Sequence, residues 1–153
     1  MSRLILARHG QSVSNAVRRF QGVQDVALSE LGERQAAALG QALRHRRVAA
    51  VYTSPLERAR RTAEIAVEGL GLSVTQVHEL RELSLGDWEG QTVEEISRLP
   101  GDPYTQWVRD PVACLPPGAE PSRMCSCGWS APWRTSRPPI PTVKRRSWCA
   151  TAA

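Results

Sequence analysis

The sequence contains no lysine before Lys144 and no acidic residue after Glu120, and these two absences divide the chain. The first 120 residues hold 14 arginines against 15 acidic residues, so they are close to neutral. The net charge of +5 therefore comes from the remaining residues, which also carry three of the 4 cysteines and three of the 5 tryptophans. Such a break in composition indicates two segments of different origin or role. We predict a domain over residues 1–120 and an aberrant basic, Cys/Trp/Pro-rich tail over residues 121–153.

Long apolar runs are also absent, since no stretch approaches the roughly 20 apolar residues of a membrane span. The N-terminus lacks a charged segment followed by an apolar one, so we expect no signal peptide, no membrane partner and a cytoplasmic protein. Neither Cys125-x-Cys127 nor the distant pair Cys114 and Cys149 has the spacing of zinc ligands. We therefore predict no metal and no cofactor.

Short apolar runs along the first 120 residues predict strands at residues 4–7, 48–52 and 74–77. The first run, Leu4 to Ala7, has no polar alternation, which is typical of a strand buried on both faces. The runs are separated by segments that begin with helix-capping residues. This alternation predicts the α/β class, with a three-layer sandwich whose mostly parallel central sheet is flanked by helices.

Three helix starts are predicted from capping residues. Ser29 precedes apolar residues at near-helical spacing, so we predict a helix over residues 30–43. Ser54, Pro55 and Glu57 form a capping box with proline at the first helical position, and that helix is expected to end near residue 68. A second capping box, from Thr92 to Glu95, predicts a short helix that ends before Pro100-Gly101.

Polar residues follow directly after the first strand, in the tripeptide Arg8-His9-Gly10. In open α/β sheets, ligands bind at the carboxyl ends of strands, so we expect this imidazole and guanidinium at a ligand site. A neutral imidazole is a good nucleophile towards phosphorus, and a guanidinium binds phosphate oxygens in a fork. The alternative for a lone histidine after a strand is a purely structural role.

Four blocks extend this pattern over about residues 3–118. They are Arg8-His9-Gly10-Gln11-Ser12 with Asn15; Leu28-Ser29-Glu30-Leu31-Gly32 with Gln35-Ala36; Thr53-Ser54-Pro55-Leu56 with Arg58-Ala59 and Thr62-Ala63; and Leu80-Arg81-Glu82 with Gly86-Asp87-Trp88-Glu89-Gly90. In their order and spacing, these blocks together resemble the histidine phosphatase superfamily, which has the phosphoglycerate-mutase-like fold.

The resemblance implies a phosphohistidine mechanism. His9 is then the nucleophile, and Glu82 is the acid that protonates the leaving oxygen and later activates water. The residues expected around the substrate phosphate are Arg8, Asn15, Gln21, Gly22 and Arg58. Phosphoryl transfer needs such positioned cations around spreading negative charge. A helix start at Arg58 also favours an anion through its N–H groups and dipole.

Some of these assignments compete with neighbouring residues of the same type. Family spacing alone separates Arg58 from Arg60 and Arg61 in a charged helix start, and Glu82 from Glu79 and Glu89. Neither other histidine fits the family pattern. His45 is expected at the solvated end of a helix and His78 at a strand end on the surface.

The likeness of the Glu82 segment favours a phosphatase over a phosphoglycerate mutase, because mutases carry a longer insertion after it. The mutase remains the alternative, and a non-catalytic binding protein is the rival from another class. In that rival, the basic, aromatic tail would contact nucleic acid. We predict a small phosphorylated metabolite as the partner and no nucleic acid. The oligomeric state is left open, with a dimer as one option.

The family carries a second histidine, in a His-Gly or His-Gly-Gly motif after another buried strand, and this chain has none. The resemblance stops after Pro116-Pro117-Gly118-Ala119-Glu120. We therefore expect the sheet to be incomplete at the C-terminus, without the strand that the family places beside the first. An exposed strand edge is an aggregation hazard, and we predict a weak or inactive phosphatase.

A shifted reading frame accounts for the tail. With codons ending nearly throughout in G or C, the bases from Arg123 onward can be re-read as DVQLRVERALADIAAAHPDGEAAVVV, then Cys or Arg, then HGG. That string predicts an amphipathic helix, a turn, an apolar strand and the absent histidine motif, in the family's order. We interpret residues 121–153 as a frameshifted reading of the family's C-terminal part.

Overall fold

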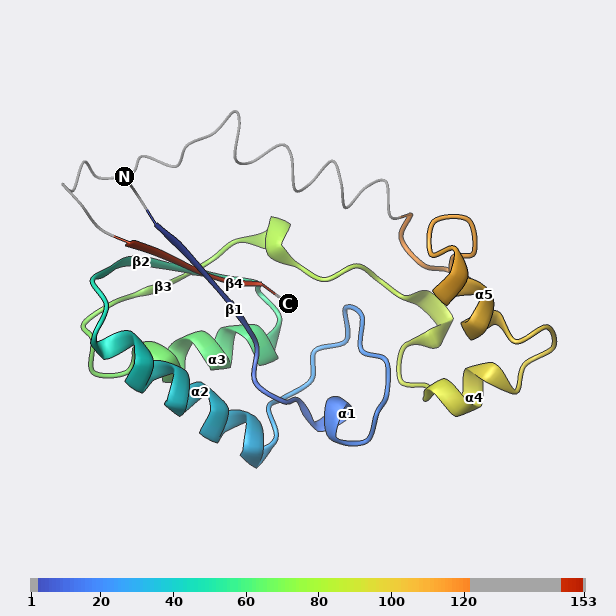
Figure 1. Cartoon of the computed structure of the whole chain (residues 1–153), viewed down its shortest axis with the longest axis horizontal. Helices are drawn as coiled ribbons and strands as arrows, with labels where there is room; N and C mark the ends of the chain where they lie inside the picture. Colours follow the sequence, from blue (N-terminus) through green and yellow to red (C-terminus); the bar gives the residue numbers. More distant parts are fainter. Residues whose placement is uncertain (1–2, 122–146, 153) are drawn as a thin grey trace. The chain divides into compact units, whose positions relative to one another are not determined.

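The computed structural model describes residues 3–121 and 147–152 of the chain (Figure 1). These residues form two compact units that interleave along the sequence. The described part of the first unit comprises residues 3–13, 25–81 and 147–152, and that of the second comprises residues 14–24 and 82–121. The division at residue 120, which rests on composition, is a different division and stays a prediction.

The first unit is built around a four-stranded parallel sheet. Its strands are β1 (Leu4–Arg8), β2 (Val48–Thr53), β3 (Val74–Gln76) and β4 (Ser147–Ala152), in the order β1-β4-β2-β3. β4 pairs with both β1 and β2, so the strand that we expected to be missing beside β1 is present, and that expectation was wrong. The expectation rested on the end of the family resemblance after Glu120, but strand pairing uses backbone N–H and C=O groups, which every residue except proline carries in full.

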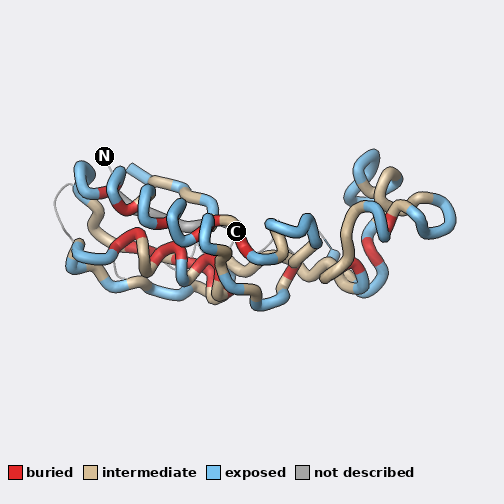
Figure 2. Tube along the Cα trace, turned by 90° about the horizontal axis from the view of Figure 1, so that it is seen from below, coloured by how far each residue is buried: buried red, intermediate tan, exposed pale blue. Residues whose placement is uncertain are grey.

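Two helices cover one face of this sheet (Figure 1). They are α2 (Glu30–Arg44) and α3 (Glu57–Val67), and the buried core lies between them and the strands (Figure 2). The core residues are Leu43, Val51, Ala63, Ala66 and Val67, with Ile5, Leu39, Val48, Leu70, Leu72 and Val74 packed against them. Parallel strands with covering helices confirm the predicted α/β class.

β1 is less buried than its apolar sequence predicts. Leu4 and Leu6 are 51% and 58% exposed, whereas Ile5 packs against the core. The expectation of burial on both faces was therefore wrong for the described residues. The physical reason is that α2 and α3 pack on one face only, so alternate side chains of β1 point away from them.

The helix starts agree with the sequence in two places and differ in one. The Ser29 hydroxyl accepts a hydrogen bond from the Gly32 N–H at 3.1 Å, as predicted for a cap. α3 begins at Glu57, not at Pro55, and its N-cap Leu56 makes no side-chain cap. The Ser54 hydroxyl instead accepts from the Leu56 N–H at 3.3 Å, which tightens the turn before the helix.

The second unit consists of short helices and turns around an aromatic cluster. After α1 (Val13–Ala16), which starts in the first unit, its elements are η2 (Gly86–Trp88), α4 (Val93–Ser97) and α5 (Pro103–Arg109). The capping box from Thr92 to Glu95 is confirmed, and the backbone N–H of Thr92 is the main cause that lowers the pKa of Glu95. Trp88 is buried among the rings of Phe20 and Trp107.

Among the described residues, every helix is too short or too polar to cross a bilayer.

Candidate active site

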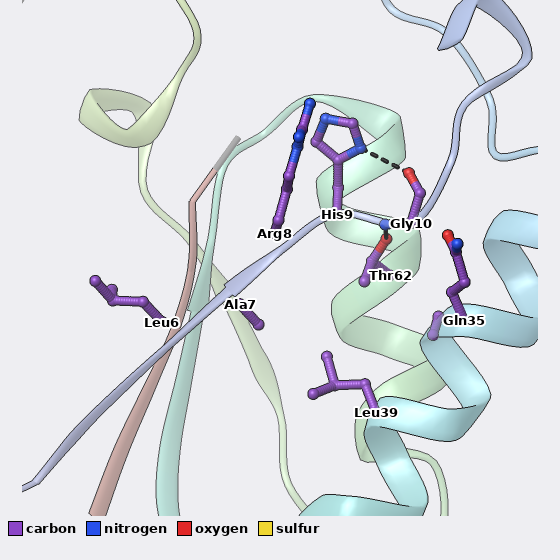
Figure 3. A pocket seen from close by; sticks show the side chains of 9 residues that line it. Leu6, Ala7, Arg8, His9, Gly10, Gln35, Leu39 and Thr62 are labelled. Atoms are coloured by element: carbon purple, nitrogen blue, oxygen red, sulfur yellow. Dashed lines mark hydrogen bonds between the residues drawn. The ribbon is translucent and has the colours of Figure 1, made fainter. Parts of the chain in front are cut away.

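A pocket of about 440 Å³ opens at the carboxyl end of β1 (Figure 3). Its polar rim is formed by Arg8, His9 and Gln35, and its floor is apolar. The full lining is Leu6, Ala7, Arg8, His9, Gly10, Gln35, Ala36, Leu39 and Thr62. The strand end therefore places the predicted imidazole and its neighbouring guanidinium side by side at a cavity, as expected for an open α/β sheet.

The imidazole of His9 is oriented by its own loop. Its Nδ1 lies 2.7 Å from the carbonyl oxygen of Gly10, and Figure 3 shows this bond at the rim of the pocket. A carbonyl oxygen can only accept, so Nδ1 carries the proton and donates it. In the neutral ring, Nε2 then holds the lone pair, which is the form needed for attack on phosphorus.

Thr62 joins the His9 loop to the helix that carries Arg58. The Thr62 hydroxyl accepts from the Gly10 N–H at 3.0 Å and donates to the Arg58 carbonyl oxygen at 2.6 Å. Both Thr62 and Arg58 are 1% exposed. Burial of a guanidinium is costly unless an anion or hydrogen-bonding groups compensate its charge, and Arg58 is not among the residues that line the pocket.

Sequence reasoning did not single out Thr62 or Gln35 as site residues. Thr62 follows Arg58 by four residues on α3, and this helical spacing is the pattern that could have identified it. Gln35 accepts from the backbone N–H of Gln11 at 2.8 Å through its Oε1 atom. That contact joins α2 to the loop after β1, and nothing in the local sequence indicates it.

The start of α3 is already occupied by a side chain. The Glu57 N–H donates to Oδ1 of Asp25, which lies on the loop before α2. An aspartate at a helix N-terminus accepts a hydrogen bond from an otherwise unpaired N–H, and its negative charge interacts favourably with the helix dipole. The Glu57 N–H is therefore not available to a phosphate in this structure, and the case for Arg58 rests on its guanidinium.

Two glycines allow the His9 loop to approach α2 closely. A Cβ at Gly10 would overlap the Gly32 carbonyl oxygen, and a Cβ at Gly32 would overlap the Gln11 carbonyl oxygen.

We expect Gly32→Ala to lower the free energy of unfolding by about 1–3 kcal/mol, because backbone atoms cannot move aside as side chains do. Urea unfolding measures this, with Gln41→Ala at an exposed position of α2 as the control. Equal stability of the two variants would show that the loop can shift at no cost.

Asn15, Gln21, Gly22 and Glu82 lie in the second unit. Gln21 begins a turn in which its carbonyl oxygen accepts from the Gln24 N–H at 2.9 Å, and Gly22 is buried with a positive φ of 50°. Glu82 is half-buried, and its Oε1 accepts from the Leu83 N–H at 3.2 Å. In the first unit, the Gly10 N–H and the Arg58 carbonyl oxygen both bond the Thr62 hydroxyl, which ties the loop that carries His9 to the helix that carries Arg58.

The competing residues differ in their surroundings. Glu89 accepts three hydrogen bonds within the second unit, so its carboxylate is already engaged by donors of the protein. Glu79 lies exposed in the 3-10 turn η1 (His78–Leu80) of the first unit. His45 and His78 are also exposed, as expected for surface residues.

Comparison with known proteins gives a family match over most of the chain. Residues 4–126 match the model of the histidine phosphatase superfamily (branch 1). Phosphoserine phosphatase 1 of Hydrogenobacter thermophilus is 38% identical over 111 residues, which are 72% of this chain and 53% of that protein. A probable phosphoglycerate mutase GpmB of Klebsiella pneumoniae (strain 342) is 40% identical over 121 residues, which are 79% of this chain and 54% of that protein.

Solved structures show the same fold. The mycobacterial glucosyl-3-phosphoglycerate phosphatase in complex with VO3 has a TM-score of 0.83 and 33% sequence identity, and the match covers 99% of this chain and 76% of the phosphatase chain. YhfR of Bacillus stearothermophilus has a TM-score of 0.81 and 32% sequence identity, and the match covers 100% of this chain and 74% of the YhfR chain. The chain spans between a third and about half the length of the curated relatives it matches.

Proposed function

This chain belongs to the histidine phosphatase superfamily, and we propose that it hydrolyses phosphate monoesters of small metabolites through a phosphohistidine on His9. The observation that carries the proposal is the orientation of His9, whose Nδ1 donates to the Gly10 carbonyl at 2.7 Å beside Arg8. Nε2 is thereby the nucleophilic nitrogen at the rim of a pocket. The similar proteins named above include phosphatases, which agrees with this choice.

In the proposed reaction, the lone pair of His9 Nε2 attacks phosphorus, and the ester P–O bond breaks. The leaving oxygen takes the proton of Glu82 and departs as an alcohol. Glu82, now ionised, removes a proton from water, whose oxygen attacks the phosphohistidine and releases inorganic phosphate. Arg8 and Arg58 bind the non-bridging oxygens, where negative charge spreads in the transition state. Asn15, Gln21 and Gly22 complete the assigned phosphate site.

Phosphohistidine formation is the direct test. Full-length protein is mixed with p-nitrophenyl phosphate, quenched rapidly, and analysed for a phosphorylated peptide by mass spectrometry. We expect phosphate on the peptide that contains His9, stable in alkali and lost in acid, because a phosphoramidate hydrolyses when its nitrogen is protonated. Hydrolysis without any phosphorylated peptide would contradict the proposal.

Phosphoglycerate mutase activity is the second candidate, supported by the GpmB relatives. The two reactions differ in what accepts the phosphoryl group from His9, which is water in a phosphatase and a sugar-acid hydroxyl in a mutase. Release of inorganic phosphate from 3-phosphoglycerate, measured beside formation of 2-phosphoglycerate, separates them. We expect phosphate release to dominate.

We expect Glu82→Gln to lower the rate with an alkyl phosphate by about a hundredfold, because loss of a positioned proton donor typically costs that much. The loss with p-nitrophenyl phosphate should be much smaller, since nitrophenolate departs without protonation. Steady-state rates with both substrates measure the difference. Glu79→Gln, at an exposed carboxylate, is the matched control, and equal losses in the two variants would remove Glu82 from its proposed role.

We further propose that the tail is a frameshifted reading and that the chain as written is a weak enzyme for lack of the second family histidine. Residues 122–146 lie outside the described residues, and of the tail the structure describes Pro121 and the backbone strand β4. The change of composition after residue 120 and the order of the re-read helix, turn, strand and histidine motif support the proposal. Sequencing the gene is the test.

A further inference from the structure

Glu89 accepts hydrogen bonds from two separate segments of the second unit. Its Oε1 accepts from the backbone N–H of Val23 at 3.1 Å, from the backbone N–H of Leu85 at 2.9 Å and from the Ser84 hydroxyl at 3.1 Å. Hydrogen bonds to an ionised acceptor are roughly twice as strong as neutral ones. One half-buried carboxylate therefore joins the loop at residues 21–24 to residues 84–85.

Gly22 provides the space that this carboxylate occupies. It is buried with a φ of +50°, in the left-handed region that favours glycine. A Cβ at this position would overlap Oε1 of Glu89 and lie 2.9 Å from the Leu85 nitrogen. The loop and the carboxylate are therefore matched in shape, and a side chain at position 22 would separate them.

The segment on the other side of Glu89 directly follows Glu82. Ser84 donates its N–H to Oε2 of Glu120 at 3.1 Å, and its carbonyl oxygen accepts from the Glu120 N–H at 3.0 Å. Ser84 is thus held by Glu120 through its backbone and by Glu89 through its hydroxyl. Two residues after the assigned proton donor, the chain has little freedom to move.

We propose that Glu89 is a positioning residue, which holds the loop at residues 21–24 against the segment that carries Glu82. It sets where the leaving group lies relative to its proton donor, and this role needs no contact between Glu89 and the substrate. The inference rests on the proposed function, because it gives Glu82 the part of the acid. A shift of about 1 Å at an acid can cost on the order of a hundredfold in rate.

The test compares leaving groups in the full chain and in its frame-restored form. In Glu89→Gln, the amide keeps the shape of the side chain but loses the charge that holds three donors. We expect the rate with β-glycerol phosphate, whose alkoxide needs a proton, to fall at least about tenfold more than the rate with p-nitrophenyl phosphate. Glu94→Gln, at an exposed site on α4, should change neither rate.

A purely structural role for Glu89 would lower both rates by the same factor, and that result would overturn the inference, as would rates equal to those of the unmodified chain. Ser84→Ala removes one donor of the three and serves where Glu89→Gln does not fold, with the same leaving-group comparison. The proposed function fails separately, when His9→Ala retains the hydrolysis of both substrates.

Discussion

Replacement of residues 123–153 by the alternative reading is expected to raise p-nitrophenyl phosphate hydrolysis about a hundredfold. The re-read histidine comes from the codons of Ala150 and Thr151. In β4, Ala150 pairs with Leu6 and Thr151 with Ala7, so the register places this histidine within the strand, two to three residues before the level of His9 and towards the same carboxyl end of the sheet. A donor that stabilises a transferring phosphoryl group is worth about 3 kcal/mol, or a hundredfold in rate.

The comparison requires two further proteins. The restored chain with alanine in place of the re-read histidine separates the contribution of the imidazole from that of better folding. We expect this control to be folded, by circular dichroism and urea unfolding, and to be as slow as the chain as written. If the restored chain is no faster than the chain as written, the frameshift does not explain the absent histidine.

His9→Ala is expected to reduce hydrolysis at least about a thousandfold in the restored chain and to abolish the phosphorylated peptide. Removal of a covalent nucleophile leaves only binding and electrostatic contributions, because His9 is the group proposed to accept the phosphoryl from the ester. Rate measurements at saturating p-nitrophenyl phosphate and mass spectrometry of the quenched enzyme provide the two readouts.

His45→Ala is the matched control for this variant, since His45 is an exposed residue at the end of α2. It should retain the full rate and the phosphorylated peptide. A His9→Ala protein that still becomes phosphorylated would move the nucleophile elsewhere. Stability is not expected to confound the result, because the His9 ring lies at the rim of a pocket and not in the core.

Strong local patterns in the sequence predicted much of the fold. Apolar runs identified three of the four strands that the structure describes, and capping residues located the starts of α2 and α4 at Ser29 and Thr92. These patterns act within a few residues, so they can be read without knowledge of the rest of the chain. Local patterns failed at α3, where Ser54 caps a turn and the distant Asp25 binds the Glu57 N–H.

β4 shows a different limit of local reading. Its sequence, Ser-Trp-Cys-Ala-Thr-Ala, has no apolar run that predicts a strand, yet it pairs with β1 and β2. Strand pairing depends on the backbone of neighbouring strands, which is available to many sequences. Side-chain patterns therefore predicted one strand fewer than the described sheet contains. They also overestimated the burial of Leu4 and Leu6, because the exposure of these side chains depends on what covers that face of the sheet.

By itself, the sequence determined the position of Arg8-His9-Gly10 after the first strand, the family resemblance and the break in composition near residue 120. Tertiary structure alone decided that Thr62 bonds Gly10 across 52 residues and that Glu89 bonds Val23 across 66. The reason is physical, because such contacts depend on how helices and turns pack and not on neighbours along the chain. Sequence motifs therefore identify the candidate catalytic residues, and tertiary packing decides which other side chains hold these residues in place.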